Sequence, residues 1–346
     1  MAGAVHMKKY NFYIGVDISK PFVDFIVSDG KHSRIHAQGA NDPESLKAFL
    51  TQLRKLEGCR ISNCIFGMEH TGIYSNHLLT VLHKLKADVV NENSIQIKNS
   101  LGLLRGKNDK LDAFRIAEYL FICRDKLTLW TEKRDIISEL SGLLTLRERL
   151  IQILHNLKVL LKQEKGFINK NLSAQNLDLC SASIAAVKTD IIKVEQKISS
   201  IWTTDKTLEH FMRIILSVPC VGQLTALNII ITSNEFKTIS TAKKFACYAG
   251  VAPFSRQSGT SVSGRSRVSH AANKKTKSLL HTCAVLSVRF VPELKAYFLR
   301  KTQQEKKHRM LVYNAIRSKI ILRVFSCINN ERMYQKDYVY TPLQHQ

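Results

Sequence analysis

Four acidic residues in the first third of the sequence have the types and spacing needed to hold a divalent cation. Asp17 follows the apolar run FYIGV, and Glu69 ends the run CIFGME. Asp109 and Asp112 stand three residues apart, a spacing that puts both carboxylates on one face of a helix. Metal-dependent phosphodiester chemistry needs several hard oxygen ligands converging on one point. The pattern therefore predicts a two-metal site for a divalent cation.

Each acidic residue taken alone also has a structural explanation. Acidic side chains are common in the first turn of a helix, where they complement the helix dipole, and this accounts for Asp109 by itself. Asp24 lies inside a predicted strand and Asp29 stands in a turn, so neither is given a role. Asp17 differs because an almost wholly apolar strand leads directly to it.

Three further residues stand close to these carboxylates in the sequence. Arg105 and Lys107 precede Asp109, and Lys107 is predicted to contact phosphate, with a simply solvated loop as the alternative. His70 follows Glu69 and is expected to donate a hydrogen bond to a ligand rather than to bind the metal, because magnesium prefers oxygen.

Alternating strands and helices must position this set. The predicted elements are strands over 11–19, 22–30 and 32–38, a helix over 43–56, a strand over 64–69, a helix over 74–86, a strand over 87–92 and a helix over 109–124. Strands alternate with helices of period 3.6, which predicts an α/β sheet.

The spacing of apolar residues changes after residue 135. Apolar residues recur in steps of three and four over 136–161 and again over 184–201, the period of a coiled coil. The polar stretch NKNLSAQNLD, residues 169–178, is interpreted as the tip of a helical hairpin that spans 136–202. Two ordinary core helices are the alternative. A long hairpin with such seams is typical of self-association.

Charge is distributed unevenly along the 346 residues. Lys and Arg exceed Asp and Glu by 52 to 28, and residues 211–346 alone hold 22 basic and 5 acidic residues. Such a basic block favours a polyanionic partner, because each neutralised phosphate releases a counterion. A membrane surface is the rival partner, but these residues follow no clear amphipathic helix, and no membrane partner is predicted.

Further features limit the class of protein. No apolar run reaches about 18 residues and no signal-peptide region opens the chain, so cytoplasmic localisation is expected. The eight cysteines form no C-x-x-C pair and are interpreted as reduced thiols. Residues 1–7 have the character of a tag remnant.

The basic segment contains several candidate nucleic-acid contacts. The stretch VPCVGQLTALNIII resembles a helix-hairpin-helix, whose turn can present backbone N–H groups to phosphate, although Cys220 stands where that motif usually has glycine. A polar loop over 253–264 follows and leads into a basic helix. The residues expected to contact nucleic acid are Lys107, Gly222, Arg256, Arg265, Arg267, Lys274, Lys275 and Lys277.

Several blocks of sequence resemble one family in order and approximate spacing. YIGVDIS, GMEHTGIY, VVNENSIQIKN and GKNDKLDAFRIAEYL, then VPCVGQLTALNII and FACYAGVAPFSRQSGTS, are similar to the DEDD insertion-sequence transposases. This is the family of the Piv invertase and the bridge-RNA-guided recombinases of the IS-one-ten and IS-eleven-eleven types, also described as DEDD-type serine recombinases. Asn108 departs from the family pattern, which usually has threonine there, and Cys220 departs as noted.

The resemblance implies an α/β RNase H-like, RuvC-like catalytic domain over 8–128, a coiled-coil helical hairpin over 129–208 and a mainly α-helical domain over 209–330. It also implies Mg²⁺ ligation by the four carboxylates. Members recombine donor and target DNA as dimers or tetramers, and some are guided by a noncoding RNA.

The resemblance further implies a serine nucleophile that forms a phosphoserine link to DNA. The family nucleophile lies in a Ser-Gly pair after a proline, and Pro253 places Ser258 there, ahead of Ser255, Ser261 and Ser263.

Two other functions remain open at this point. A RuvC-like nuclease or junction resolvase would use the carboxylates without a covalent intermediate, and a nonenzymatic nucleic-acid scaffold would use them only as caps. Tyr74, Tyr248 and Tyr297 are not predicted to be nucleophiles, because no surrounding Arg/His constellation is evident in the sequence.

Overall fold

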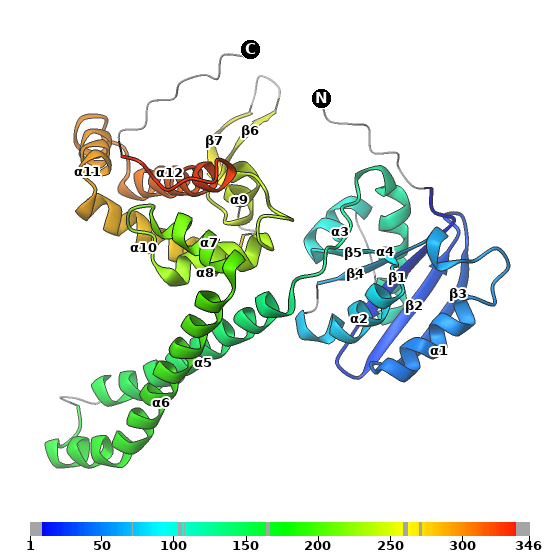
Figure 1. Ribbon diagram of the computed structural model, residues 1–346, viewed down its shortest axis with the longest axis horizontal. Helices are drawn as coiled ribbons and strands as arrows, with labels where there is room; N and C mark the ends of the chain where they lie inside the picture. The colour runs from blue at the N-terminus through cyan, green and yellow to red at the C-terminus, as the bar shows by residue number, and fades with distance from the viewer. Residues whose placement is uncertain are drawn as a thin grey trace. The chain divides into compact units, whose positions relative to one another are not determined.

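The computed structural model describes residues 9–70, 72–102, 106, 108–163, 167–258, 262–269 and 272–336. The chain divides into two compact units, residues 1–132 and 133–346. Each unit is described by itself below (Figure 1). The described helices include none long and apolar enough to cross a membrane.

The first unit contains a five-stranded mixed sheet of order β3-β2-β1-β4-β5. Its strands are β1 (Phe12–Ile18), β2 (Phe22–Ser28), β3 (Ser33–Ala40), β4 (Cys64–Glu69) and β5 (Asp88–Glu92). The first three strands form an antiparallel meander, whereas β4 and β5 join parallel to β1. This arrangement confirms the predicted α/β sheet.

Helices cover both faces of this sheet. On one face, α1 (Pro43–Leu53) and α2 (Asn76–Lys84) bury leucines and Phe49 against the even-numbered residues of β1. On the other face, α3 (Ser94–Leu101) and α4 (Asp109–Ile122) pack against Tyr13 and its neighbours. Alternate residues of a strand point to opposite faces, so β1 supplies both cores. Short 3₁₀ turns, η1 (Ile61–Asn63), η2 (Gly72–Ser75) and η3 (Arg124–Lys126), complete the unit.

The second unit begins with two long antiparallel helices, α5 (Asp135–Gln163) and α6 (Lys170–Thr204), here called the arm. The predicted tip is wrong: residues 170–178 belong to α6, which begins at the Asn169 cap. Asn169 Oδ1 accepts a hydrogen bond from the backbone N–H of Asn171, so a polar sequence starts a helix here rather than forming a turn. The coiled coil itself stays a prediction.

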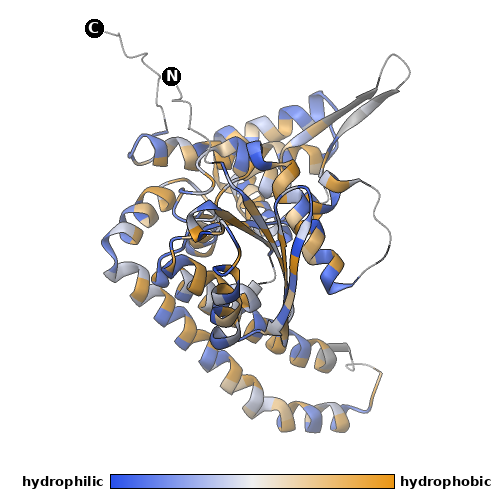
Figure 2. Ribbon diagram, turned by 90° about the vertical axis from the view of Figure 1, so that its right-hand side faces the viewer, coloured by the Kyte–Doolittle hydropathy of each residue, from blue (hydrophilic) through white to orange (hydrophobic). Residues whose placement is uncertain are grey.

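Burial along the arm is uneven. The described side chains that are buried all lie near its base: Ile137, Leu140, Leu144, Val194, Ile198 and Ile201. Farther out, apolar residues such as Ile153 (48% exposed) and Leu179 (73%) face solvent. Figure 2 shows apolar residues recurring along both helices of the arm. The pair Arg147–Glu195, at 2.7 Å, links the two helices partway along.

One arginine ties the base of the arm together. Arg134, just before α5, donates to both carboxylate oxygens of Asp205, at the junction of α6 and α7. It also donates to Glu235, which follows α8 and whose side chain is 2% exposed. A buried carboxylate is tolerated when it is paired and hydrogen-bonded in this way.

The remainder of the second unit is mainly helical, as predicted. It contains α7 (Lys206–Leu216), α8 (Gln223–Ser233), α9 (Ala242–Tyr248), α10 (Lys274–Phe290), α11 (Pro292–Leu299), a short π-helical turn (Arg300–Gln304) and α12 (Arg309–Asn329). Helix α8 is buried along nearly its whole length, and Phe245 and Phe325 pack beside it in the same core.

The loop predicted over 253–264 is in part a β-hairpin. Strand β6 (Pro253–Ser258) pairs antiparallel with β7 (Val262–Val268), with an irregular register between Phe254 and Arg256. The loop interpretation was wrong because Ser and Gly content outweighed the alternation of larger and smaller residues, such as Arg265 and Arg267 around Ser266. Figure 1 shows this hairpin projecting from the helices of its unit.

Candidate carboxylate site and basic hairpin

Two glycines determine where the carboxylates lie. Gly15 of β1 pairs with Gly67 of β4 in parallel register, and both face α4. A Cβ atom at Gly15 would lie 2.0 Å from the carbonyl oxygen of Ala113, so only glycine permits this approach. Asp17 and Glu69 each stand two residues beyond one of these glycines and therefore share their face of the sheet.

Helix α4 brings the other two carboxylates to the same edge. Asp109 lies one helical turn before Ala113, the residue in contact with Gly15, and Asp112 lies in the same first turn. Asn108 caps the helix, since its Oδ1 accepts a hydrogen bond from the N–H of Leu111 at 2.7 Å. Asparagine thus performs a capping role that threonine could also serve.

An arginine holds the second of these carboxylates. Arg115 Nη1 lies 2.8 Å from Asp112 Oδ1, and Arg115 Nη2 donates to the carbonyl of Gly106 at 3.0 Å. The guanidinium therefore connects Asp112 to the backbone of the segment before the helix. Because Arg115 is only 12% exposed, this contact fixes the carboxylate more firmly than an exposed ion pair would.

Asp17 is electrostatically coupled to the other three carboxylates. Burial, and after it the negative charges of Asp112, Asp109 and Glu69 in that order, together raise its pKa to about 6. The N–H of Ile18 lowers it but does not compensate. The structure therefore brings the four predicted residues close enough to repel one another, a situation that a bound cation relieves.

The donor set suits a hard cation. Carboxylate oxygens are the ligands that Mg²⁺ and Mn²⁺ prefer. Across the described ranges, no three or more His, Cys, Asp or Glu side chains are grouped closely enough to hold a metal ion as they stand. Asp109 is exposed and Asp112 is partly exposed, so ligation requires these first-turn side chains to move toward Asp17 and Glu69.

Asp24 is the residue that the sequence interpretation set aside and the structure places beside the site. It is the direct cross-strand partner of Asp17 and is 3% exposed. Its two oxygens lie 2.9 Å from His36 Nε2 and 3.0 Å from Gln38 Nε2. Like charges directly opposite one another are unfavourable, and these two contacts offset that cost. The sequence signal for this placement is the alternation of side chains in residues 22–28 and 33–40, which is typical of two paired strands.

The other predicted neighbours are only partly described. His70 is exposed, and its backbone N–H donates to Glu92 at 3.0 Å, which continues the β4–β5 pairing. Its role toward a ligand stays a prediction. Arg105 and Lys107 lie outside the described residues.

The predicted nucleophile ends a strand of the hairpin. Ser258 pairs with Val262 across the last described pair of β6 and β7. For Ser255, Ser258, Ser263, Arg256 and Arg265 the structure describes the backbone alone, and Ser261 lies outside the described residues. Arg267 is exposed and pairs with Phe254 near the base of the hairpin.

The three predicted lysines cluster in the first turn of α10. Asn273 caps this helix by accepting from the N–H of Thr276. Lys275 forms a 2.6 Å ion pair with Glu148 of α5, whereas Lys274 is exposed and Lys277 is partly exposed. Cations at a helix N-terminus are unfavourable toward the dipole, so such a turn is suited to a bound anion.

The predicted hairpin turn before α8 is formed with cysteine in a strained conformation. The N–H of Val221 donates to the carbonyl of Val218, with Pro219 and Cys220 between them. Cys220 has φ of 65°, the left-handed region that favours glycine. Gly222 is the exposed N-cap of α8. Its N–H also lowers the pKa of the buried Cys283 thiol, although burial raises that pKa overall.

Tyr297 has cationic neighbours that the sequence did not reveal. Lys319, Arg300 and Lys301 lie 5.0, 5.7 and 5.9 Å from its ring centroid. Tyr248 instead accepts a hydrogen bond from Asn273, and burial raises its pKa.

These features define an enzyme of the transposase and DNA recombinase class, which acts on DNA. Residues 14–163 match a model described as a transposase, of the DEDD type of IS110, and residues 212–299 match the "Transposase IS116/IS110/IS902 family". The two matches together cover more than half of the chain, which belongs to the IS110 family of transposases. Transposases with this DEDD domain typically use a divalent metal.

Individual relatives agree with this family. The chain is 26% identical over 273 residues to the pilin gene-inverting protein of Moraxella bovis, covering 78% of this chain and 81% of the relative. The protein of the same name from Moraxella lacunata gives the same values. A 43.6 kDa uncharacterized protein of insertion element IS110 from Streptomyces coelicolor is 26% identical over 122 residues, 35% of this chain and 30% of the relative. The term serine recombinase is therefore wrong for this chain, since the matched families are transposases.

Proposed function

We propose that this transposase cleaves and rejoins DNA at a magnesium site formed by Asp17, Glu69, Asp109 and Asp112. The observation that carries the proposal is the closeness of the four carboxylates: burial, and after it the negative charges of Asp112, Asp109 and Glu69, raise the pKa of Asp17 to about 6. A bound divalent ion would polarise the scissile phosphate and stabilise the charge that develops on it. Arg115 would hold Asp112 in place for ligation.

Ser258 is the proposed nucleophile. Its Oγ would form a bond to phosphorus while the bond from phosphorus to one deoxyribose oxygen breaks. The proton lost by the serine hydroxyl is balanced by the proton gained by the leaving oxygen. The phosphoserine link conserves the energy of the phosphodiester, so rejoining needs no ATP. Arg256, Arg265 and Arg267 would hold the phosphate, because guanidinium groups match its geometry.

The partners belong to the same proposal. Donor and target DNA would bind the basic second unit, including the first turn of α10. A structured noncoding RNA would guide target choice. Exposed apolar residues along the arm favour a dimer or tetramer.

The test compares single variants on a denaturing gel with labelled DNA in Mg²⁺. Asp17→Ala, Glu69→Ala, Asp109→Ala and Asp112→Ala should each stay folded and bind DNA without cleaving it. Ser258→Ala should form no covalent protein–DNA adduct, whereas the matched control Ser255→Ala should form it. Full activity in all four carboxylate variants would refute the metal assignment.

The same gel distinguishes the hydrolytic alternative. Magnesium-dependent cleavage with no adduct in the parent protein would identify a nuclease and remove the serine step. Sequencing the nucleic acid that co-purifies with the parent tests the guide, since random host fragments in place of one defined RNA would contradict it.

A further inference from the structure

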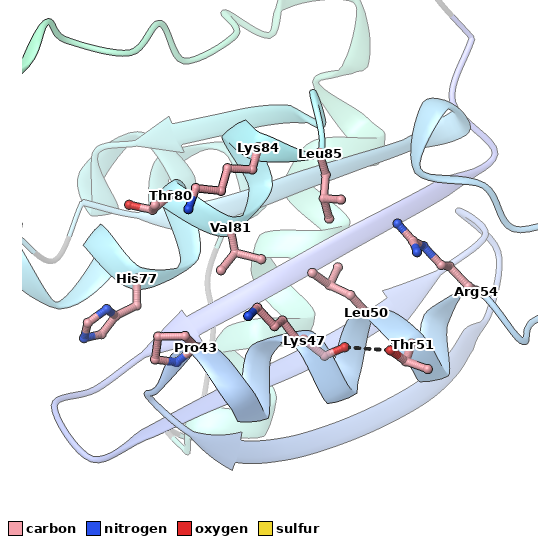
Figure 3. Close-up of a pocket in the computed structure, with 10 residues that line it drawn as sticks. All are labelled: Pro43, Lys47, Leu50, Thr51, Arg54, His77, Thr80, Val81, Lys84 and Leu85. Atoms are coloured by element: carbon pink, nitrogen blue, oxygen red, sulfur yellow. Dashed lines mark hydrogen bonds between the residues drawn. The ribbon is translucent and has the colours of Figure 1, made fainter.

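A groove runs between α1 and α2, on the sheet face opposite α4 and the carboxylates. The pocket between these two helices has a volume of about 350 Å³. Leu50 from α1 and Val81 and Leu85 from the α2 side form an apolar floor (Figure 3). Because these side chains also pack on the sheet core, the floor is a fixed part of the fold.

Cations surround this floor. Lys47 lies on α1 and Arg54 is its C-cap, whereas Lys84 and the imidazole of His77 lie on α2; all four side chains are exposed. The residues that line the pocket include no Asp or Glu. Among the described residues, Lys47, Arg54 and Lys84 form no ion pair with a carboxylate. The rim therefore offers positive charge that no carboxylate in the described part of the unit neutralises through an ion pair.

The groove continues beyond this pocket. A second pocket shares Arg54 and Leu85 and adds Arg60 and Lys86. A third shares Lys84 and Lys86 and adds Trp130, a partly buried aromatic side chain. Positive charge along a groove with an aromatic ring beside it is the combination by which proteins bind unpaired nucleic acid, through phosphate contacts and base stacking.

The spacing of the cations suits a strand. Lys47 on α1 and Arg54 at its C-cap are seven residues apart, a distance of about 10 Å, and Lys84 of α2 supplies a third cation on the facing wall. At about 3.4 Å per nucleotide of a stacked strand, that distance corresponds to roughly three nucleotides. A duplex would present phosphates to the rim but keep its bases away from Leu50, Val81 and Trp130.

We propose that this groove binds an unpaired segment of a DNA strand. DNA is the occupant because the family acts on DNA and because the rim is cationic while the floor and Trp130 are apolar. The contact would hold a displaced strand away from the cleavage chemistry, on the other face of the sheet. It does not depend on the proposed metal or on Ser258.

The experiment measures binding of the full chain to a 20-nucleotide DNA strand, to the same sequence as a duplex and to the same sequence as RNA, all in EDTA. The variant carries Lys47→Gln, Arg54→Gln and Lys84→Gln. The matched control carries Lys20→Gln, Lys31→Gln and Lys55→Gln, three exposed lysines of the same unit outside the groove.

The groove variant should bind the DNA strand about 100-fold more weakly at 0.1 M salt and lower the salt slope by about 2, since each lost contact contributes about 0.7 on single strands. The control should change the affinity much less. Trp130→Leu keeps an apolar side chain but removes base stacking, so it should lower the affinity for the DNA strand about fivefold.

Three outcomes would overturn the proposal: equal losses in variant and control, a loss confined to the duplex, and a loss confined to RNA. Because EDTA removes divalent metal, a negative result here leaves the proposed cleavage chemistry untouched. A failed cleavage assay likewise leaves the groove untouched.

Discussion

Helix α4 and the two helices of the arm both carry apolar residues along their length. They differ in how much of that apolar surface is buried within one chain. Along α4, Ala113 and Ala117 are buried, and glycines in β1 and β4 receive the helix at close range. Along the arm, burial is confined to its base, and apolar residues farther out face solvent. A site that depends on α4 can therefore be formed by one chain, whereas the distal arm lacks the surface that would cover it.

The largest expected effect comes from closing the α4 contact. Gly15→Ala would place a methyl group 2.4 Å from the backbone nitrogen of Ala117, so the helix must move. We expect unfolding free energy to fall by about 3 kcal/mol. Cleavage should fall about 100-fold or more, because misplacing reacting groups by about 1 Å has that effect. Urea unfolding and the cleavage gel measure the two effects.

The control for this change is Gly142→Ala, on the exposed side of α5 with no atom near the new methyl group. It should stabilise the protein by about 0.5–1 kcal/mol through helix propensity. If Gly15→Ala behaved in the same way, the glycine contact would not be what positions α4.

The second effect concerns the uncovered arm. Replacing the exposed residues Ile153 and Leu179 by Lys should raise the dimer dissociation constant about 100-fold, because burial of each large aliphatic side chain contributes about 1.5–3 kcal/mol. Light scattering at several concentrations measures the mass. Asn156→Lys with Thr189→Lys adds the same charge at exposed polar positions of the arm and should leave the mass unchanged. A monomeric parent protein would remove the basis of the comparison.

A smaller effect tests how much the burial of Asp17 near three other carboxylates lowers the stability of the folded protein. The pKa of Asp17 is about 6 in the folded protein and near 3.8 when unfolded, so the folded state binds more protons between these values. Without metal, stability should therefore fall as pH rises from about 4 to about 6. Asp17→Asn removes the charge and should exceed the parent by about 1–2 kcal/mol at pH 7.5, with no difference below about pH 4.

The matched acid is Asp29, whose pKa is lowered by N–H groups of His32 and Lys31. Asp29→Asn should show the opposite trend: it should be less stable than the parent at neutral pH, and this difference in unfolding free energy should disappear as pH falls. Adding Mg²⁺ at pH 7.5 should reverse the order of parent and Asp17→Asn in thermal unfolding. An Asp17→Asn protein less stable than the parent at pH 7.5 in EDTA would contradict the coupling of the four carboxylates.

The smallest effect contrasts glycine use in the two units. In the first unit most described residues with positive φ are glycines, Lys86 being the exception, whereas in the second unit Cys220 adopts φ of 65° in the turn before α8. Cys220→Gly should raise unfolding free energy by about 0.5–1 kcal/mol, since left-handed backbone costs a non-glycine residue about 1–2 kcal/mol and glycine returns part of that as entropy. Cys220→Ala, which keeps the strain, should show no gain by the same measurement.

The sheet could be predicted because the apolar residues in each strand and helix of the first unit repeat with the period of that element. The carboxylates could be predicted because strand ends and a helix first turn are recognisable locally. Asp24 could not be judged this way, since its importance comes from pairing with Asp17 across β1 and β2. A usable signal was the repeat Gly15-x-Asp17 and Gly67-x-Glu69, which marks a helix crossing both strands just before the acids.

In the second unit, local composition was less informative. The polar character of residues 170–178 predicts a turn, whereas the structure has them in α6, because a capped helix tolerates polar residues that face solvent. The hairpin of β6 and β7 was taken for a loop for a similar reason. The α1–α2 groove could not be predicted from the sequence, because its cations come from two helices separated by β4 and two short turns, and only folding brings them together.

The Arg134 contacts at the base of the arm have a mechanical consequence. Both ends of the arm meet at this single guanidinium, which also connects to the segment after α8. At 29 residues, α5 is a rod about 43 Å long, so a rotation of about 5° at its base would displace its far end by about 4 Å. A force applied to the far end of the arm would therefore act on the contacts of Arg134 with Asp205 and Glu235, which join the arm to the core of its unit.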